Sequence, residues 1–398
     1  MATIGLLIRG PHLSVHKNGN ALSLFSIASP SRPVVGSTTS PLKPTSIYNA
    51  GGTRLLAHFE GAGAPQRVGT NMKGSPRVMQ EMPQKSWSPF MRAGLGVAAL
   101  GFGVAAYHRR RTSLARYATA SMPEAPYPAT PLSDRFVVYT VPMFDDNYGW
   151  LITDTEMGTC VAVDPGEPGA IVRAVEQLGL QLTRVLITHK HGDHTGGNTS
   201  LKKQVPGLEI VGTGYEPIPG LMVAVEEGDK FDLFGSPQNL TPTSVIATPC
   251  HTKGHVVFFV EPQGPGAVPA LFSGDTLFVG GCGRFFEGTA NQMYDNLVQK
   301  IARLPDETLV FCAHEYTESN LSFALQVEPD NSALQAKVKW VQDQRAQGLP
   351  TVPSTLGEEQ AYNPFMRCGQ ASVMARVGAS SPVDSMHLLR EGKNRGQI

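Results

Sequence analysis

The pattern of apolar positions divides the chain near residue 134. From there on, short runs rich in β-branched and aromatic residues follow one another, separated by Gly, Pro and Asp. Runs of this length and composition predict strands. They are FVVYTVPMF, GWLITD, CVAVDP, RVLITH, EIVGTG, SVIATP, HVVFFVE, ALFSGDTLF and TLVFCAH.

Helical spacing of apolar residues lies between some of these runs. It predicts helices over Gly169–Leu178 and Asn291–Leu304. Strands interleaved with helices indicate an α/β architecture in which helices cover the sheets. After His314 the strand pattern stops, and we expect helices only, at 321–327, 333–347 and 385–393.

The N-terminal part has a different character. Residues 1–92 are rich in Ser, Thr, Pro, Gly and Ala, and no window there offers enough apolar residues for a core. Residues 1–123 contain 14 of the 33 basic residues but only two of the 33 acidic ones, Glu60 and Glu81. This composition favours a transit peptide for a mitochondrion or a plastid, which we do not distinguish. An ordinary disordered extension is the alternative.

An apolar run, AGLGVAALGFGVAAY, occupies residues 93–107 and is followed by His108 and three arginines. A membrane-spanning helix needs about 20 apolar residues, so this run is short. It is either the second half of a bipartite targeting signal that is removed on import, or a weak single-pass anchor. We therefore expect a leader over 1–133, a catalytic domain over 134–314 and a helical substrate-binding domain over 315–398.

Charge and cysteine content exclude some classes. The net charge of the whole chain is zero, and the part after residue 123 has 19 basic and 31 acidic residues. This balance argues against a nucleic-acid partner. The five cysteines are widely spaced and form no C-x-x-C pair, which indicates reduced thiols in a non-secretory compartment.

A cluster of metal-ligand residues follows the run RVLITH. The loop THKHGDHTGGN places three imidazoles and one carboxylate within six positions, at His189, His191, Asp193 and His194. Two histidines at i and i+2 on an extended loop can converge on one ion, while the Asp-His pair turns towards a second ion. The loop therefore predicts a metal centre.

Three further candidates lie at the ends of apolar runs, where sheets collect functional groups. His255 precedes VVFFVE, Asp275 ends ALFSG, and His314 ends TLVFCA. His251 is less favourably placed, and we interpret it as a structural residue or one that supports the ligands.

These motifs resemble a known superfamily. The succession of His-x-His-x-Asp-His, a later His, Gly-Asp-Thr and a strand-end His is similar to the metallo-β-lactamase superfamily, an αββα sandwich of two sheets flanked by helices. Within it, the stretches ATPCHTKGH, FSGDTLFVGGCGRFFEGT, CAHEYT, VPSTLGEE and YNPFMR resemble the glyoxalase II (hydroxyacylglutathione hydrolase) family. The resemblance covers residues 135–393. The ligand loop identifies only the superfamily, whereas HEYT and YNPFMR are more specific.

The resemblance implies two divalent metal ions and assigns their ligands. One ion would lie on His189, His191 and His255, and the other on Asp193, His194 and His314, with Asp275 bridging both. Nitrogen and oxygen ligands without a thiolate suit zinc, and also iron or manganese. A hydroxide shared by the two ions, held in place by Asp193 and Asp275, would then hydrolyse S-D-lactoylglutathione to D-lactate and glutathione, the second step of methylglyoxal detoxification.

The resemblance also implies a glutathione site at Arg284, Phe286, Tyr316, Arg390 and Lys393. The last two are three residues apart on a predicted helix and share one face, although such a pair is usually only solvated surface. Phe286 departs from the family, in which a tyrosine is common, so one hydrogen bond to glutathione is in doubt. We expect a monomeric enzyme with a small-molecule substrate.

Four alternatives compete with this interpretation. A β-lactamase usually has Cys in place of Asp275 and lacks the helical extension. A persulfide dioxygenase uses a single iron and lacks YNPFMR, and a nuclease would carry a nucleic-acid-binding module. A non-catalytic, membrane-tethered binding protein would have no need of the intact ligand set.

Overall fold

A computed structural model describes residues 127–397 of the chain. The predicted leader up to residue 126, including the apolar run at 93–107, lies outside the described residues. None of the helices within 127–397 combines the length and the apolar character that a membrane span requires.

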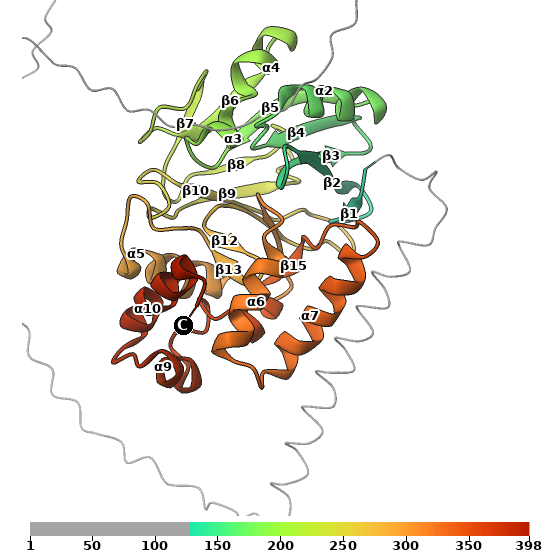
Figure 1. Cartoon of the computed structure of the whole chain (residues 1–398). Coiled ribbons are helices and arrows are strands. Elements are labelled where there is room, and N and C mark those ends of the chain that lie inside the picture. The colour runs from blue at the N-terminus through green and yellow to red at the C-terminus, as the bar shows by residue number, and fades with distance from the viewer. Residues whose placement is uncertain (1–126, 398) are drawn as a thin grey trace, which may run out of the picture. The chain divides into compact units, whose positions relative to one another are not determined.

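Two mixed sheets form the centre of the fold (Figure 1). In the first sheet, neighbours are antiparallel from β1 to β4 and parallel from β4 to β7. Its strands are β1 (Ala129–Pro131), β2 (Phe136–Met143), β3 (Asn147–Asp154), β4 (Thr159–Val163), β5 (Gln181–Ile187), β6 (Glu209–Thr213) and β7 (Val223–Val225).

The second sheet has the order β15-β14-β11-β10-β9-β8, in which only β11 and β14 are parallel neighbours. Its strands are β8 (Lys230–Asp232), β9 (Pro242–Ala247), β10 (Val256–Val260), β11 (Ala270–Gly274), β14 (Leu309–Cys312) and β15 (Ser354–Thr355). A small hairpin of β12 (Leu277–Phe278) and β13 (Gly281–Cys282) follows β11.

The helices lie outside the two sheets. The first group is α2 (Pro168–Gln177), α3 (Gly192–Thr195), α4 (Asn198–Gln204) and α5 (Ala290–Tyr294), the last continued by a π-helix at Asp295–Lys300 and a 3₁₀ turn at Ile301–Arg303. The C-terminal group is α6 (Thr317–Val327), α7 (Ser332–Arg345), α8 (Leu356–Tyr362), α9 (Ala371–Val377) and α10 (Pro382–Arg395).

Alternation along each strand divides the core into three layers. In β10, Phe258 faces the space between the sheets, whereas Phe259 faces the helices that cover the second sheet. In β3, Trp150 faces the same central layer, whereas Leu151 packs with the residues of α2 and α4. Because these strands are buried on both faces, they appear in the sequence as continuous apolar runs. The predicted αββα sandwich is confirmed.

Some short elements differ from the sequence-based expectation. The two-residue strand β15 pairs with β14, so the expectation that strands end at His314 was wrong. The first strand of the first sheet, β1, lies within the range predicted as the leader, 1–133. Leu132 lies in the same range and is only 1% exposed. Strands of two or three residues are too short to show alternation in the sequence. Whether they form depends on the strands with which they pair.

The carboxyl ends of β4, β5, β9, β11 and β14 meet at one edge of the sandwich, where the two sheets are joined. The backbone N–H of Tyr148 donates to Ala313 O at 2.7 Å, and that of Glu315 donates to Asp146 O at 2.8 Å. An isolated bridge pairs Asn147 with His314. Side chains from both sheets can therefore meet at this edge.

Candidate active site

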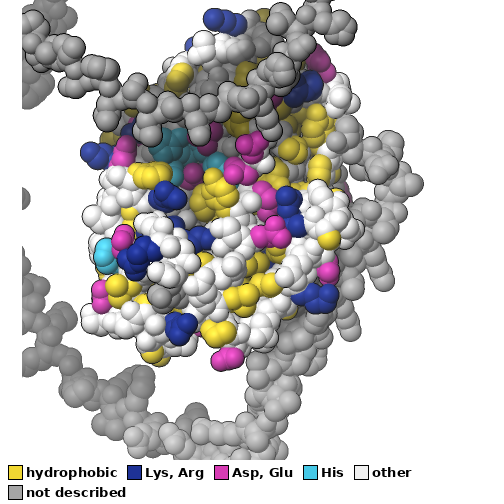
Figure 2. All heavy atoms as spheres, viewed as in Figure 1, with side chains coloured by type: hydrophobic (Ala, Val, Ile, Leu, Met, Phe, Trp, Pro, Cys, Tyr) yellow, Lys and Arg dark blue, Asp and Glu magenta, His cyan; other side chains and the backbone are white. Residues whose placement is uncertain are grey.

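The predicted ligand loop lies at this edge, directly after β5. His189 is fully buried, and Asp193 and His194 belong to the short helix α3. His189 Nε2 lies 2.9 Å from His191 Nδ1, and His194 Nε2 lies 3.4 Å from Asp193 Oδ2. The four residues of the loop therefore face a common centre. Figure 2 shows histidine side chains gathered in a hollow on this face of the molecule.

Asp275 and His314 join the centre from the ends of β11 and β14. Asp275 Oδ1 lies 3.5 Å from His194 Nε2 and 3.4 Å from His314 Nε2. His314 Nε2 lies 3.5 Å from Asp193 Oδ2. The Asp275 carboxylate thus stands between two sets of ligands.

The seventh ligand position belongs to His251 and not to His255. His251 Nε2 lies 3.1 Å from His191 Nδ1 and 3.2 Å from Asp275 Oδ2. Its atoms group with those of His189 and His191 closely enough to hold one ion. The assignment of His251 to a supporting role was therefore wrong.

Both ring nitrogens of His255 are already engaged. The backbone N–H of Asp275 donates to His255 Nε2 at 3.2 Å, and His255 Nδ1 contacts the hydroxyls of Thr248 at 3.0 Å and Thr276 at 3.1 Å. Gly274 lies against this ring, since a Cβ there would be 2.9 Å from His255 Nε2. His255 has no lone pair left for a metal, and its role is to hold the turn that carries Asp275.

Four histidines are oriented by oxygen acceptors behind them. Nδ1 of His194 lies 3.0 Å from Asp164 Oδ2, that of His314 lies 2.9 Å from Asp146 Oδ1, and that of His251 lies 3.1 Å from Arg284 O. His189 Nδ1 lies 3.1 Å from the Thr188 hydroxyl, which itself donates to Asp164. Carboxylate and carbonyl oxygens only accept, and the Thr188 hydroxyl has already donated its own proton, so each Nδ1 carries a proton and each Nε2 faces the centre.

Asp146 and Asp164 were not singled out from the sequence. Asp164 follows β4 with a positive φ of 48°, and it also accepts a bond of 2.8 Å from the backbone N–H of Thr188. Asp146 lies between β2 and β3. The sequence does contain one indication for Asp164, because this carboxylate comes directly after the apolar residues of a predicted strand.

The donor set fits a pair of cations. Among the described residues, two separate groups surround positions suitable for an ion, His189 with His191 and His251, and Asp193 with His194 and His314. A third group, His189 with His194 and Asp275, shares members with both and lies between them. His191 Nδ1 lies 2.9 Å from His189 Nε2 and 3.1 Å from His251 Nε2, close to the separation of about 3.3 Å between two nitrogens of a tetrahedral zinc site. His194 Nε2 and Asp275 Oδ1 are buried and make no hydrogen bond in the protein. Such atoms need a partner that the chain itself does not provide.

The electrostatics of the centre point the same way. Burial opposes the charge of His194, but the carboxylates of Asp275 and Asp164 outweigh it and raise the pKa of His194 well above its ordinary value. Burial also disfavours the charge of Asp193, but the nearby His194 ring and a hydrogen bond from Asn147 hold the pKa of Asp193 below its ordinary value. Burial lowers the pKa of His189 well below its ordinary value, so this ring stays neutral and able to coordinate. The protein therefore favours positive charge among the carboxylates.

A cavity of about 770 Å³ opens beside the centre, with His251 and Asp275 in its wall. The five residues predicted to bind substrate line it together: Arg284, Phe286, Tyr316, Arg390 and Lys393.

Aromatic rings connect this cavity to the metal centre. The Phe286 ring lies 5.1 Å from that of His251, and the Tyr316 ring stacks on His314 at 4.6 Å. Arg390 and Lys393 both reach the cavity from α10, as expected from their spacing. Arg390 is buried and donates to Cys282 O at 3.0 Å, and Lys393 donates to Ser319 O at 2.7 Å.

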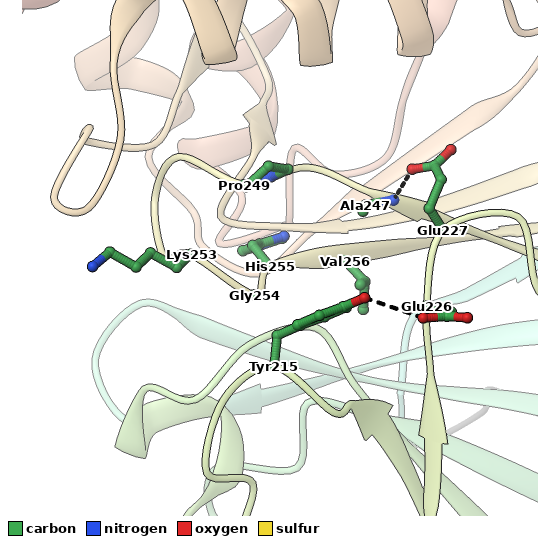
Figure 3. Close-up of a pocket in the computed structure, with 9 residues that line it drawn as sticks. All are labelled: Tyr215, Glu226, Glu227, Ala247, Pro249, Lys253, Gly254, His255 and Val256. Atoms are coloured by element: carbon green, nitrogen blue, oxygen red, sulfur yellow. Dashed lines mark hydrogen bonds between the residues drawn. The ribbon is translucent and has the colours of Figure 1, made fainter.

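A second cavity, of about 400 Å³, borders the far side of the turn that carries His255 (Figure 3). Its polar groups pair with one another. The Tyr215 hydroxyl donates to Glu226 at 3.1 Å, and Glu227 accepts from the backbone N–H of Ala247 at 2.7 Å. Lys253 extends away from it. This cavity offers no converging set of free donors or ligands.

Comparison with known proteins agrees with this geometry. Residues 144–314 match the model of the metallo-beta-lactamase superfamily, and residues 315–396 match that of the hydroxyacylglutathione hydrolase C-terminus. The two matches meet at the predicted domain boundary.

Curated relatives cover the same part of the chain. It is 44% identical to the cytoplasmic hydroxyacylglutathione hydrolase of Arabidopsis thaliana over 65% of this chain and 98% of that protein. It is 47% identical to the hydroxyacylglutathione hydrolase of Photobacterium profundum over 62% of this chain and 93% of that protein. The chain therefore belongs to the hydroxyacylglutathione hydrolase (glyoxalase II) family, the thioester hydrolases of the metallo-β-lactamase superfamily.

Proposed function

We propose that the chain hydrolyses S-D-lactoylglutathione to D-lactate and glutathione, with related 2-hydroxyacyl thioesters as further substrates. The observation that carries this proposal is the single cavity in which Arg284, Arg390 and Lys393 lie next to Asp275 and His251. A cavity lined by both cationic side chains and the ligand cluster matches a substrate that carries carboxylates and a thioester.

Two divalent cations, which we propose to be zinc, would be held by the ligand sets described above. When bound, they would lower the pKa of a shared water and polarise the thioester carbonyl. The chain's own contribution is orientation. Asp146 and Asp164 fix the rings of His314 and His194, while Asn147 donates to Asp193 Oδ2 at 3.0 Å.

The substrate would be held away from the reacting carbon. Arg390 and Lys393 would pair with the glutathione carboxylates, and the exposed ring of Phe286 would cover the path between the cavity and His251. Because every group of the centre and the cavity comes from one chain, we propose that the monomer is active.

The decisive assay compares substrates on the purified full chain. We expect the fastest hydrolysis for S-D-lactoylglutathione within a panel of glutathione thioesters. A higher rate on glutathione persulfide or on a β-lactam would contradict the proposal and would support one of the alternative enzymes. A chain that binds metal and glutathione but turns over none of these would be a binding protein.

We also propose that the N-terminal part directs the protein to a mitochondrion or a plastid. The support is its composition, rich in Ser, Thr and basic residues and poor in acidic ones. The run at 93–107 would be either part of the removed signal or a weak anchor. A fluorescent protein fused to residues 1–125 should accumulate in one of these organelles, and a diffuse cytosolic signal would contradict the proposal.

A further inference from the structure

The Glu287 side chain connects three segments that are far apart in the sequence. Lys190 Nζ donates to Glu287 Oε1 at 2.6 Å, and the backbone N–H of Lys253 donates to Glu287 Oε2 at 2.9 Å. The backbone N–H of Glu287 donates to Cys250 O at 3.1 Å. One residue therefore uses both carboxylate oxygens and its main chain to hold neighbouring loops.

Each connected segment carries part of the active site. Lys190 lies between the ligands His189 and His191, and Lys253 lies two residues after His251. Glu287 itself follows Phe286, which lines the substrate cavity. A single ion pair thus connects the loops of one ligand set to the segment that would contact glutathione.

A second carboxylate holds Lys190 from the other side. Glu216 Oε2 lies 3.6 Å from Lys190 Nζ, and Glu216 Oε1 accepts from the Thr252 hydroxyl at 2.7 Å. Gly254 allows this approach, because a Cβ there would be 2.4 Å from Glu216 Cγ. Lys190 lowers the pKa of Glu287 through their hydrogen bond, so this carboxyl stays charged. The lysine is therefore confined between two acidic groups and cannot swing away without breaking both contacts.

We propose that Glu287 is a positioning residue that couples the ligand loops to the glutathione-binding segment. It touches neither the ligand positions nor the reacting atoms. It acts by fixing the main chain of residues 284–287, and with it Arg284 and Phe286, relative to His191 and His251. The inference rests on the proposed function, because it assumes a glutathione thioester in the cavity.

The test compares two thioesters that differ only in the thiol. Glu287→Gln removes the charge but leaves an amide oxygen that can accept from Lys253. We expect kcat/KM for S-D-lactoylglutathione to fall about threefold to thirtyfold. The fall for S-D-lactoyl-N-acetylcysteamine, which lacks the glutathione carboxylates, should be smaller. Glutathione itself, titrated by calorimetry, should bind correspondingly more weakly.

Two further variants serve as an independent check and as a control. Lys190→Met breaks the same ion pair from the other partner, and the double variant should lose no more than the worse single variant. Glu209→Gln is a matched control, because Glu209 pairs with Arg184 at 2.6 Å at the start of β6, away from the carboxyl end of β5 that carries the ligand loop. It should leave the ratio of the two rates unchanged.

Equal losses on both thioesters, or a loss of bound metal in proportion to activity, would overturn the inference and leave Glu287 as a structural tie only. Additive losses in the double variant would also contradict it. If wild-type protein failed to hydrolyse S-D-lactoylglutathione, the proposed function would fail instead.

Discussion

The metal centre and the substrate cavity share the side chains of His251 and Asp275 but are built in different ways. The centre is made mostly of buried groups that follow strand ends, and each Nδ1 that faces away from it meets an oxygen acceptor. The cavity is made of residues from loops, from α6 and from α10, among them Phe286, which is 60% exposed. The chemistry therefore depends on short side chains held from behind by hydrogen bonds, whereas binding depends on longer side chains that reach into the cavity from several elements.

The largest effect should come from removing Asp275, which lies between the two sets of ligands, or the buried ligand His194. Asp275→Ala and His194→Ala should each lower kcat by at least about a thousandfold, because several kcal/mol of Lewis-acid stabilisation depend on them. Folding should largely survive, as judged by circular dichroism and thermal melting. Retention of more than about a tenth of the rate would show that the shared centre does not perform the reaction.

His251 and His255 offer the sharpest contrast between a ligand and a supporting residue. His251→Ala should remove about one equivalent of bound metal and lower kcat by about a hundredfold or more. His255→Ala should keep the bound metal but destabilise the fold by about 1–3 kcal/mol, because it leaves the backbone N–H of Asp275 without an acceptor. Metal content by mass spectrometry and unfolding in denaturant distinguish the two variants. The reverse pattern would mean that His255, as first expected from the sequence, is the metal ligand.

Changes in the cavity should act on binding. Arg390→Ala and Lys393→Ala should raise KM between a few-fold and about a hundredfold with kcat near that of the wild type, as expected when uniform binding is lost. Arg395→Ala is the control, since Arg395 lies on the same helix and does not line the cavity. Unchanged KM in both cavity variants would mean that α10 does not contact the substrate.

A smaller change at Phe286 tests the same region in the opposite direction. Phe286→Tyr restores the hydroxyl common in the family and should lower KM by a few-fold, the value of about one neutral hydrogen bond. Steady-state kinetics on S-D-lactoylglutathione measure this change in KM. A raised KM would mean that the hydroxyl meets no acceptor on glutathione.

The pH dependence of KM should report the ionisation of Lys393. Burial, aided by the charge of Arg390, lowers the pKa of Lys393 to about 8. The charged form that attracts a carboxylate is therefore present below this pH and is lost above it. KM should rise by a few-fold as the pH passes upwards through about 8, and Lys393→Met should abolish this rise. The same rise in the variant would assign it to another group.

The α/β architecture, the helical C-terminal part and most of the centre could be predicted from the sequence. Strands buried on both faces produced continuous apolar runs, and the loop from His189 to His194 holds its ligands within a few residues. Local spacing was sufficient because these features depend on neighbours in the chain.

The choice between His251 and His255, which lie in the same short stretch, TPCHTKGH, depended on long-range contacts. The backbone N–H of Asp275 takes the last lone pair of His255, while Arg284 O turns His251 towards the centre. Asp146, Asp164 and Glu287 acquire their roles in the same way, from partners far away in the chain. Spacing along a chain cannot reveal which nitrogen is already bonded, because that depends on groups brought together only when the two sheets pack.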